Sequence, residues 1–458
     1  MSHSSVDVVV VGAGAAGISG AVALAELGLH VVVLDEQGSP GGQIYRGITL
    51  APLSRRDMLG PDYAHGNELA QALASSSVRY EKGAAVWQVT REHEVSYLRE
   101  GRLHTLQAKA VLLATGAMER PFPIPGWTLP GVMSAGAAQI LLKSSGLAPS
   151  EPVVLAGCGP LLYLLGWQYL RAGVPIKALV DTTRPDDYWR ARRHLFAALR
   201  AWPYLRKGLE LMRSLRSARI AHFTGAEQLA VEGDEAARAL TFTVAGKAER
   251  IATRCVLLHQ GVVPNIQFSQ SLRARHHWDV DQLCFSPVVD SWGELDVAGV
   301  FVAGDGAGIG GAQAAAVQGQ LAALGIAVRL EKLSDAQRAF RAEALRARLA
   351  SNLRIRPFLD ALYQPKEANR IPADDVMVCR CEEVTAGELR GFVALGCTGP
   401  NQAKSFGRCG MGPCQGRMCG LTVTEVIAKA RGVSASEVGY YRIRPPIKPI
   451  TLGELAGD

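Results

Sequence analysis

The sequence predicts an α/β protein with two strand–glycine turn–helix units in its first 330 residues and a small separate domain at the C-terminus. Two apolar strands are each followed at once by a glycine-rich turn, at Gly12 and at Gly157. A strand, a glycine turn and a helix in this order are typical of a parallel sheet that binds a nucleotide. Six of the nine cysteines fall in the last eighty residues, which sets that region apart.

Composition limits the possible classes of protein. The chain has 458 residues, of which 48% are hydrophobic and 20% charged, so it can form two to four globular domains. The net charge of +7 is too mild and too dispersed to indicate nucleic-acid binding. The clustered cysteines favour a metal site in a reducing, cytoplasmic compartment over disulfides. We identify no signal peptide, because a strand begins at Val6.

The first unit, residues 6–36, carries the motif Gly12-Ala-Gly14-Ala15-Ala16-Gly17 between a strand and a helix. Gly12 makes the tight turn, Gly14 lets a pyrophosphate approach, and Gly17 lets the helix and strand pack closely. A second strand, 30–34, is followed by two acids, and one of them can accept hydrogen bonds from ribose hydroxyls. Asp35 has the better register, and Glu36 is the alternative.

Three further segments favour FAD over NAD at this first turn. The segments are Ser39-Pro-Gly41-Gly42-Gln43, the strand end Ala114-Thr115-Gly116 and the turn Gly304-Asp305 before a helix over 312–324. An acid at such a turn can bind ribitol hydroxyls, and the helix N-terminus can face a flavin. In this order the segments resemble the flavoproteins with two dinucleotide-binding domains, of the glutathione reductase type, over residues 6 to about 330.

The second turn, Gly157-Cys158-Gly159-Pro-Leu-Leu162, departs from the motif because Leu162 stands at the third glycine. The inserted domain binds NAD(P)H in the resembling flavoproteins, and here we expect a vestigial or differently used site. Cys158 has no paired cysteine, which excludes a disulfide reductase. We interpret His259 as structural and assign no catalytic residue.

The C-terminal cysteines indicate a metal centre. Cys379-Arg-Cys381 is followed about thirty residues on by a glycine-rich segment that contains Cys414 and Cys419. Four thiolates are the usual ligands of an iron–sulfur cluster. Zinc is the alternative, although its cysteine pairs are usually spaced C-x2-4-C. Cys409 could replace Cys414 or Cys419, but the turn Gly-Met-Gly-Pro-Cys-Gln-Gly frames Cys414, so we expect Cys409 outside the ligand set.

Two surface segments are candidates for docking. Residues 184–219 contain ten Lys/Arg, three acids and interleaved aromatic residues. This pattern predicts an amphipathic helical hairpin whose basic face is solvated. The alternative is a docking face for another subunit or for a membrane surface. The tail Pro445-Pro446-Ile447-Lys448-Pro449 cannot be helical, and we expect it to lie extended along a partner or the chain itself.

The predicted domain boundaries are 1–120 with 270–335 (FAD domain), 121–269 (second, degenerate domain), 336–372 (helical linker) and 373–458 (cluster domain and tail).

The whole chain resembles the α (A) subunits of heteromeric flavin-dependent amino-acid dehydrogenases, such as opine oxidases, D-hydroxyproline dehydrogenase and hydrogen cyanide synthase. Gly-Gly-Gln-Ile-Tyr-Arg at 41–46, Cys-Arg-Cys-Glu-Glu-Val-Thr and Gly-Met-Gly-Pro-Cys-Gln-Gly-Arg carry this resemblance. The cluster segment is similar to bacterioferritin-associated ferredoxin, which implies a [2Fe–2S] centre.

This resemblance implies that an amino acid, imino acid or opine is oxidised on a second FAD-dependent (β) subunit. The present chain would pass the electrons to a respiratory acceptor. The resemblance further implies three options, which are a small third subunit, FMN at an interface between subunits, and peripheral contact with the inner membrane. The competing hypotheses are an NAD(P)H-dependent reductase that feeds a ferredoxin-like acceptor, disfavoured by Leu162, and a non-catalytic scaffold, disfavoured by the intact first turn.

Overall fold

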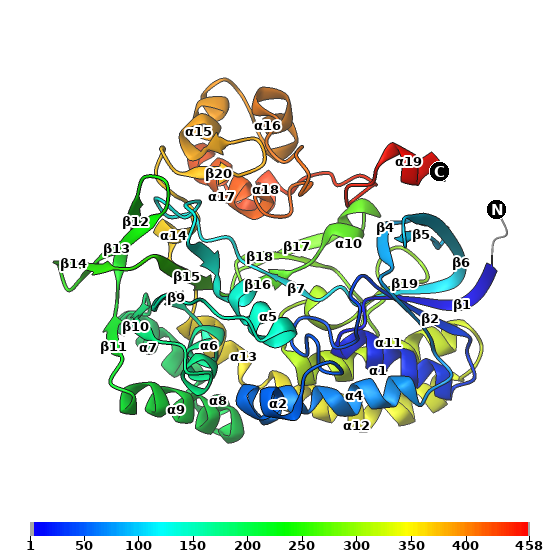
Figure 1. Cartoon of the computed structure of the whole chain (residues 1–458). Coiled ribbons are helices and arrows are strands. Elements are labelled where there is room, and N and C mark those ends of the chain that lie inside the picture. Colours follow the sequence, from blue (N-terminus) through cyan, green and yellow to red (C-terminus); the bar gives the residue numbers. More distant parts are fainter. Residues whose placement is uncertain (1–3, 457–458) are drawn as a thin grey trace.

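The computed structural model describes residues 4–456, which form two sheet-based units and a small C-terminal domain that lies on them (Figure 1). The first sheet has the order β3-β2-β1-β6-β5-β4, and β19 also pairs with β6. Its strands are β1 (Ser4–Val11), β2 (Val31–Asp35), β3 (Arg79–Lys82), β4 (Ala85–Val89), β5 (Glu94–Arg99), β6 (Arg102–Leu113) and β19 (Val300–Val302). Strand β1 is parallel to β2 and β6, with Val8 opposite Val31.

Helices cover one face of this sheet. The apolar strand residues Val8 and Val10 are buried among side chains of α1 (Ala15–Glu26), α4 (Gly66–Ala74) and α11 (Ala312–Arg329). A Cβ atom at Gly20 would lie 3.0 Å from the carbonyl oxygen of Gly319, so α1 and α11 pack backbone to backbone. This packing fixes the N-termini of both helices at one edge of the sheet.

The second sheet has the order β11-β10-β9-β15-β8 and is joined to the first unit by the antiparallel pair β7–β16. The elements of this unit are β7 (Ala117–Glu119), β8 (Val132–Ser134), α5 (Ala135–Ser145), β9 (Val153–Cys158), α6 (Pro160–Arg171), β10 (Ile176–Asp181), β11 (Ala221–Thr224), β15 (Cys255–Gln260) and β16 (Val262–Pro264). A three-stranded sheet, β12 (Glu227–Gly233), β13 (Ala237–Val244) and β14 (Lys247–Ala252), covers one face.

Residues 184–219 form short helices rather than a simple hairpin. These are α7 (Pro185–Ala191), η1 (Arg192–His194), α8 (Leu195–Leu199) and the longer α9 (Trp202–Ser217). Arg192 stacks on Trp189, and Arg200 stacks on Phe196. The exposed fractions of the Trp189 and Phe196 side chains are 65% and 68%, so this surface is aromatic as well as basic.

The predicted linker is packed along its length. It forms α12 (Asp335–Leu353), α13 (Arg356–Leu362) and α14 (Glu367–Arg370). Helix α12 packs on α11, whereas α13 packs on α7 and η1 of the second unit. The linker therefore lies against both units before it enters the C-terminal domain.

The C-terminal domain continues the core of the first unit. Buried Val378, Val423 and Ile443 belong to the same apolar cluster as Val9 and Val111 of the first sheet. The domain consists of β20 (Met377–Cys379), β21 (Val384–Thr385), α15 (Ala386–Ala394), α16 (Pro400–Gly407), α17 (Gly420–Arg431) and α18 (Ala435–Val438), and α19 (Leu452–Ala456) follows the tail.

The proline-rich tail lies along the chain itself. It leaves the C-terminal domain and reaches the side of the first unit near β4 (Figure 1). The Ile447 N–H donates to the carbonyl oxygen of Trp87 at 3.1 Å, and the Ile447 side chain is buried.

Short connecting elements complete the fold. They are α2 (Leu53–Leu59), α3 (Pro61–Ala64), α10 (Gln267–Ser271), β17 (His276–Asp279), β18 (Cys284–Pro287) and η2 (Gly304–Gly306). Within residues 4–456, we find no helix with the length and apolar character that crossing a bilayer requires.

Candidate functional site

A cavity of about 1230 Å³ opens between the two units. Thirteen of the fourteen residues predicted to bind the dinucleotide line it: Gly12, Gly14, Ala15, Ala16, Asp35, Glu36, Gly42, Gln43, Ala114, Thr115, Gly116, Gly304 and Asp305. Gly17 does not line the cavity, because it packs under the turn. A Cβ atom there would lie 1.9 Å from the carbonyl oxygen of Gly12.

The two glycine segments of the first unit face each other across one end of the cavity. A Cβ atom at Gly42 would lie 2.8 Å from the Cα of Gly14, and a Cβ atom at Gly12 would lie 2.6 Å from the carbonyl oxygen of Ala114. Gly14 is the N-cap of α1, so the positive end of the helix dipole faces this gap. Backbone alone forms the floor, which suits a pyrophosphate at a helix N-terminus.

The two acids after β2 differ in their surroundings. Both carboxylate oxygens of Asp35 accept backbone hydrogen bonds, from Ala13 N at 2.6 Å and from Gln37 N at 2.7 Å. Strand β2 extends to Asp35, one residue beyond the predicted end, which turns this side chain towards the glycine turn. Burial raises the pKa of Asp35, and the two backbone donors oppose that effect. Asp35 therefore organises the turn, and each of its oxygens already accepts a backbone hydrogen bond.

Glu36 is the more exposed acid, and its carboxylate pairs with Lys448 of the tail. Burial opposes its ionisation, but the hydrogen bond and charge of Lys448, with a contribution from Arg417, lower the pKa of Glu36 overall. Glu36 thus remains an ionised acceptor at the edge of the cavity.

Asp305 lies in η2, between β19 and α11. Its Oδ1 accepts from Gly310 N at 2.9 Å and from Gly311 N at 2.8 Å, immediately before α11 begins. The cavity is lined there by Gly311 and Ala312 as well. The carboxylate therefore holds the turn that presents the N-terminus of α11 to the cavity.

Two buried cations at the cavity were missed in the sequence analysis. Lys143 on α5 donates to Gln139 Oε1 at 2.7 Å and to the carbonyl oxygen of Gln43 at 3.4 Å. Burial, with a smaller contribution from the charge of Arg46, lowers the pKa of Lys143 to about 7. The Arg46 side chain donates to Gln43 Oε1 at 2.9 Å. No sequence signal marks either residue, since a lysine near the end of a helix usually faces solvent.

The second glycine turn also borders the cavity, through Gly159, Pro160 and Leu161, but two of its side chains are bonded within the chain. Leu162 is fully buried, and the Cys158 Sγ donates to the carbonyl oxygen of Tyr363 at 3.5 Å, just after α13. The Asp181 carboxylate, at the end of β10, accepts from the Tyr163 hydroxyl and from Thr183 N at 2.7 Å. The acid that a nucleotide ribose would need is therefore already bonded.

His259 lies near the end of β15, beside this second turn. Its Nδ1 lies 2.6 Å from Glu119 Oε1, and the other oxygen of Glu119 accepts from Gly136 N at 2.8 Å. The pair ties β15 to the first residues of α5, which agrees with a structural role for His259.

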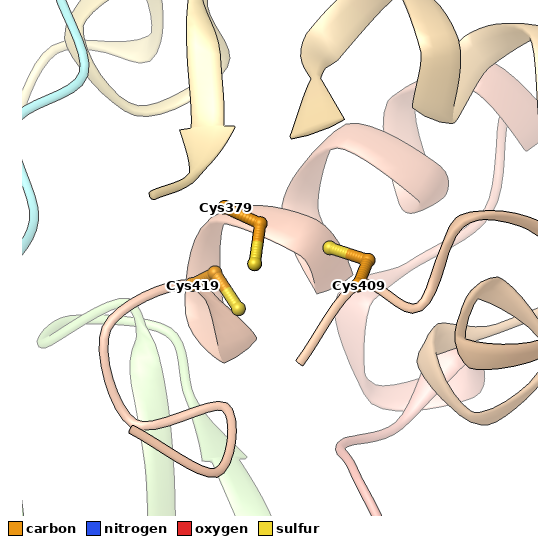
Figure 2. Close-up of side chains that lie close together, drawn as sticks. All are labelled: Cys379, Cys409 and Cys419. Atoms are coloured by element: carbon orange, nitrogen blue, oxygen red, sulfur yellow. The ribbon is translucent and has the colours of Figure 1, made fainter. Parts of the chain in front are cut away.

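The cysteines gather in the C-terminal domain (Figure 2). The sulfur atoms of Cys379, Cys409 and Cys419 lie within 4.8 Å of one another and point into a common space. Hydrogen bonds from the Cys409 and Cys419 thiols strongly lower the pKa of Cys379. The sulfur of Cys409, which we expect outside the ligand set, lies in this group, because Arg408, the C-cap of α16, adopts a left-handed conformation (φ 58°) that turns Cys409 inwards. Which four thiols are the ligands stays a prediction.

Cys381 and Cys414 form the outer part of the same group. Cys414 shares hydrogen bonds with Cys419 and with Cys381, and the Cys419 thiol is the larger cause of its lowered pKa, about 5. Cys381 is exposed and Cys414 is half-buried. Five sulfur atoms are therefore available for a centre that needs four.

This cysteine group adjoins the cavity. Arg417 and Met418, which lie between Cys414 and Cys419 in the chain, line the cavity together with Ile447 and Lys448. The loop that carries two of the thiols is thus also part of the cavity wall.

Comparison with known proteins identifies two matching families. Residues 6–319 match the pyridine nucleotide-disulphide oxidoreductase family, and residues 375–458 match the sarcosine oxidase A3 domain. The chain is 46% identical to the A subunit of opine oxidase from Agrobacterium tumefaciens (strain Ach5), over 98% of this chain and 91% of that protein. It is 30% identical to the HcnB subunit of hydrogen cyanide synthase from Pseudomonas protegens, over 97% and 96% of the two chains.

Among solved structures, L-proline dehydrogenase from P. horikoshii has a similar fold, with a TM-score of 0.73. The match covers 99% of this chain and 80% of that one at 22% identity, so it concerns the fold alone. The fold class predicted from the sequence, an α/β protein with two dinucleotide-binding units, is confirmed.

Proposed function

Since the chain belongs to the pyridine nucleotide-disulphide oxidoreductase family, and within it to the flavin-dependent oxidase subunits that include the A subunit of opine oxidase, we propose that it is an electron-transfer subunit of a heteromeric dehydrogenase. The donor would be an opine, amino acid or imino acid, oxidised on a partner flavoprotein. The observation that carries this proposal is the shared wall between the dinucleotide cavity and the cysteine group, formed by Arg417 and Met418.

The residues at the first turn fit FAD. Gly14 and Gly42 leave a backbone cradle for the pyrophosphate, and Lys143 and Arg46 add positive charge. We assign the adenosine ribose to Glu36 rather than Asp35, because Glu36 has the free acceptor. Asp305 and the N-terminus of α11 would receive the ribitol and the flavin ring. Once bound, FAD would supply the two-electron redox chemistry, and the protein supplies position and charge.

The cysteine group fits a [2Fe–2S] centre, with four ligands from the five thiols. Cys379 and Cys419 are buried and central, and the lowered pKa of Cys379 and Cys414 favours thiolates. The spacing of the cysteines in the sequence favours Cys381 and Cys414 as the other two ligands. The position of its sulfur beside Cys379 and Cys419 makes Cys409 a fifth candidate. A one-electron centre beside the flavin cavity suits transfer to a respiratory acceptor.

The surface of α7, α8 and α9 is the proposed docking face for the partner flavoprotein. Its exposed aromatic side chains include Trp189, Phe196 and Trp202. Exposed apolar clusters rimmed by charge are typical of protein interfaces. Peripheral contact of this face with the inner membrane is the alternative use.

Co-expression with a candidate partner flavoprotein tests the proposal. The complex should oxidise an opine or amino acid with an artificial dye as acceptor, and the chain alone should not. A purified single chain whose turnover matched that of the complex would refute the division of labour. A screen of opines, amino acids and imino acids would identify the substrate class.

A further inference from the structure

We propose that the C-terminal tail, residues 445–450, is part of the dinucleotide site, and that Lys448 is a positioning residue for the acid that binds the adenosine ribose. This inference rests on the proposed FAD site. It adds a partner for Glu36 that lies 412 residues away in the sequence.

The tail is anchored to the first unit by backbone and by side chain. The Ile447 N–H donates to the carbonyl oxygen of Trp87 on β4 at 3.1 Å. The exposed fraction of Ile447 is 1%, and its side chain belongs to the apolar cluster that includes Val86 and Val89. An exposed tail segment would not bury an isoleucine to this extent, so this stretch is a docked strap.

The next residue brings charge to the cavity. Lys448 pairs with Glu36, and the exposed fraction of the lysine side chain is 25% against 46% for the glutamate. Both side chains line the cavity together with Ile447 and Arg417. A partly buried ion pair at a cavity edge is less screened than a surface pair, so it can fix the carboxylate in one orientation.

The pairing leaves acceptor capacity for a ligand. A carboxylate has about four lone-pair sites, and within residues 4–456 Glu36 forms an ion pair with Lys448 and a side-chain hydrogen bond with Gln37, which leaves sites free. By holding the acid ionised and oriented, Lys448 prepares it to accept ribose hydroxyls. Ile447 at the same time closes the cavity wall beside the acid.

Docking of the strap and binding of the dinucleotide should stabilise each other. If the strap completes the site, the dinucleotide must stabilise the docked strap by the same factor by which the strap strengthens dinucleotide binding. Removal of the strap should weaken FAD binding, and FAD should protect the strap from proteolysis.

The test measures the dissociation constant of FAD by fluorescence titration of the full-length apo chain. We expect Lys448→Met to weaken binding by about fivefold, and termination after Arg444 to weaken it by more than about tenfold. Lys448→Arg should restore most of the affinity. The matched control is Lys429→Met, since Lys429 forms an exposed pair with Glu367 at 2.9 Å in the same domain, away from the cavity.

A double-mutant cycle then separates positioning from general stability. With Glu36→Gln already present, Lys448→Met should have little further effect on the FAD dissociation constant. Limited proteolysis should release the tail faster without FAD than with it. Equal FAD affinity of Lys448→Met and wild type, or tighter binding by the variant, would overturn this inference alone. A wild-type chain that binds no FAD would overturn the proposed function and this inference together.

Discussion

The two glycine turns of this chain have the same topology and both border the cavity, but their side-chain surroundings differ. Each follows a buried parallel strand and opens a helix, and each has an acid at the end of the next strand. At the first turn the wall is backbone, and Glu36 faces an open cavity. At the second turn, Tyr363 caps Cys158 and Tyr163 binds Asp181. The motif thus predicts the shape of the turn, whereas the segments packed on it decide whether a nucleotide fits.

The origin of the difference lies outside both motifs. The first turn is bordered by Gly41 and Gly42, which have no side chains to fill the gap. The second is covered by α13 and the residues after it, held by the Lys366–Asp187 ion pair and by the bond of Arg190 to the carbonyl oxygen of Ala361. The same linker that leads to the cysteine domain therefore packs against the second turn.

The sharpest way to break the comparison is to fill the first turn. Gly14→Val should lower the FAD content of the purified protein by at least about tenfold, because the added methyl groups would occupy the pyrophosphate cradle facing Gly42. Gly391→Val is the control, since Gly391 lies in α15, away from the cavity, and has open space around it. FAD released by acid and measured by absorbance gives the ratio. Full FAD content in Gly14→Val would show that the first turn is not the flavin site.

The cysteine group adjoins the cavity at Arg417 and Met418, and the identity of its ligands is the next test. Serine at Cys379 or Cys419 should abolish iron binding and the paramagnetic resonance signal of the reduced centre, because both thiols are buried at the middle of the group. Serine at Cys381, Cys414 and Cys409, one at a time, identifies the remaining ligands. Iron retained in Cys379→Ser would contradict a cluster at this position.

Lys143, which lines the cavity, should have a smaller and pH-dependent effect on the free energy of unfolding. Its folded pKa of about 7 lies below the value of about 10.4 in an unfolded chain. The unfolded state therefore binds more protons between these values, and the free energy of unfolding should rise with pH from about 7 to 10.

The slope that Lys143 contributes should approach about 1.4 kcal/mol per pH unit in the apo protein, measured by urea denaturation. Lys143→Met should remove this slope. Saturating FAD should reduce it, because an anion beside the ammonium raises its pKa. An identical slope in wild type and Lys143→Met would contradict the burial of this charge.

The smallest expected effect is at the second turn. Anaerobic mixing with NADH should leave the flavin absorbance unchanged over several minutes, because the Asp181 carboxylate that a nucleotide ribose would need is already bonded within the chain. The control is dithionite, which should bleach the same sample. Rapid bleaching by NADH would favour the NAD(P)H-dependent reductase instead.

The sequence predicts well what depends on neighbouring residues. The first turn, its strand and helix, and the degenerate second turn all follow from spacing. Spacing does not separate Asp35 from Glu36, because one residue of strand length decides which side chain bonds to the glycine turn. The position of Cys409 depends on the left-handed backbone of Arg408. The sequence does not predict this conformation, because Arg408 is not a glycine.

Long-range packing lay beyond sequence reasoning for a different reason. Contacts such as Cys158 with Tyr363 and Glu36 with Lys448 join segments separated by 205 and 412 residues. No periodicity or motif relates such segments, because each is locally an ordinary loop. The contact of the linker with the second turn and the strap beside the first turn are therefore seen only in the folded chain.

The ion pair between Glu36 and Lys448 has a consequence for biosynthesis. A ribosome releases the first glycine turn early, but Lys448 follows Glu36 by 412 residues, and at about 5–20 residues per second the interval is tens of seconds. The first unit can fold during that interval with an unfinished cofactor site. Flavin acquired during translation would therefore be held loosely until the strap emerges, so stable loading is a late step in the maturation of this protein.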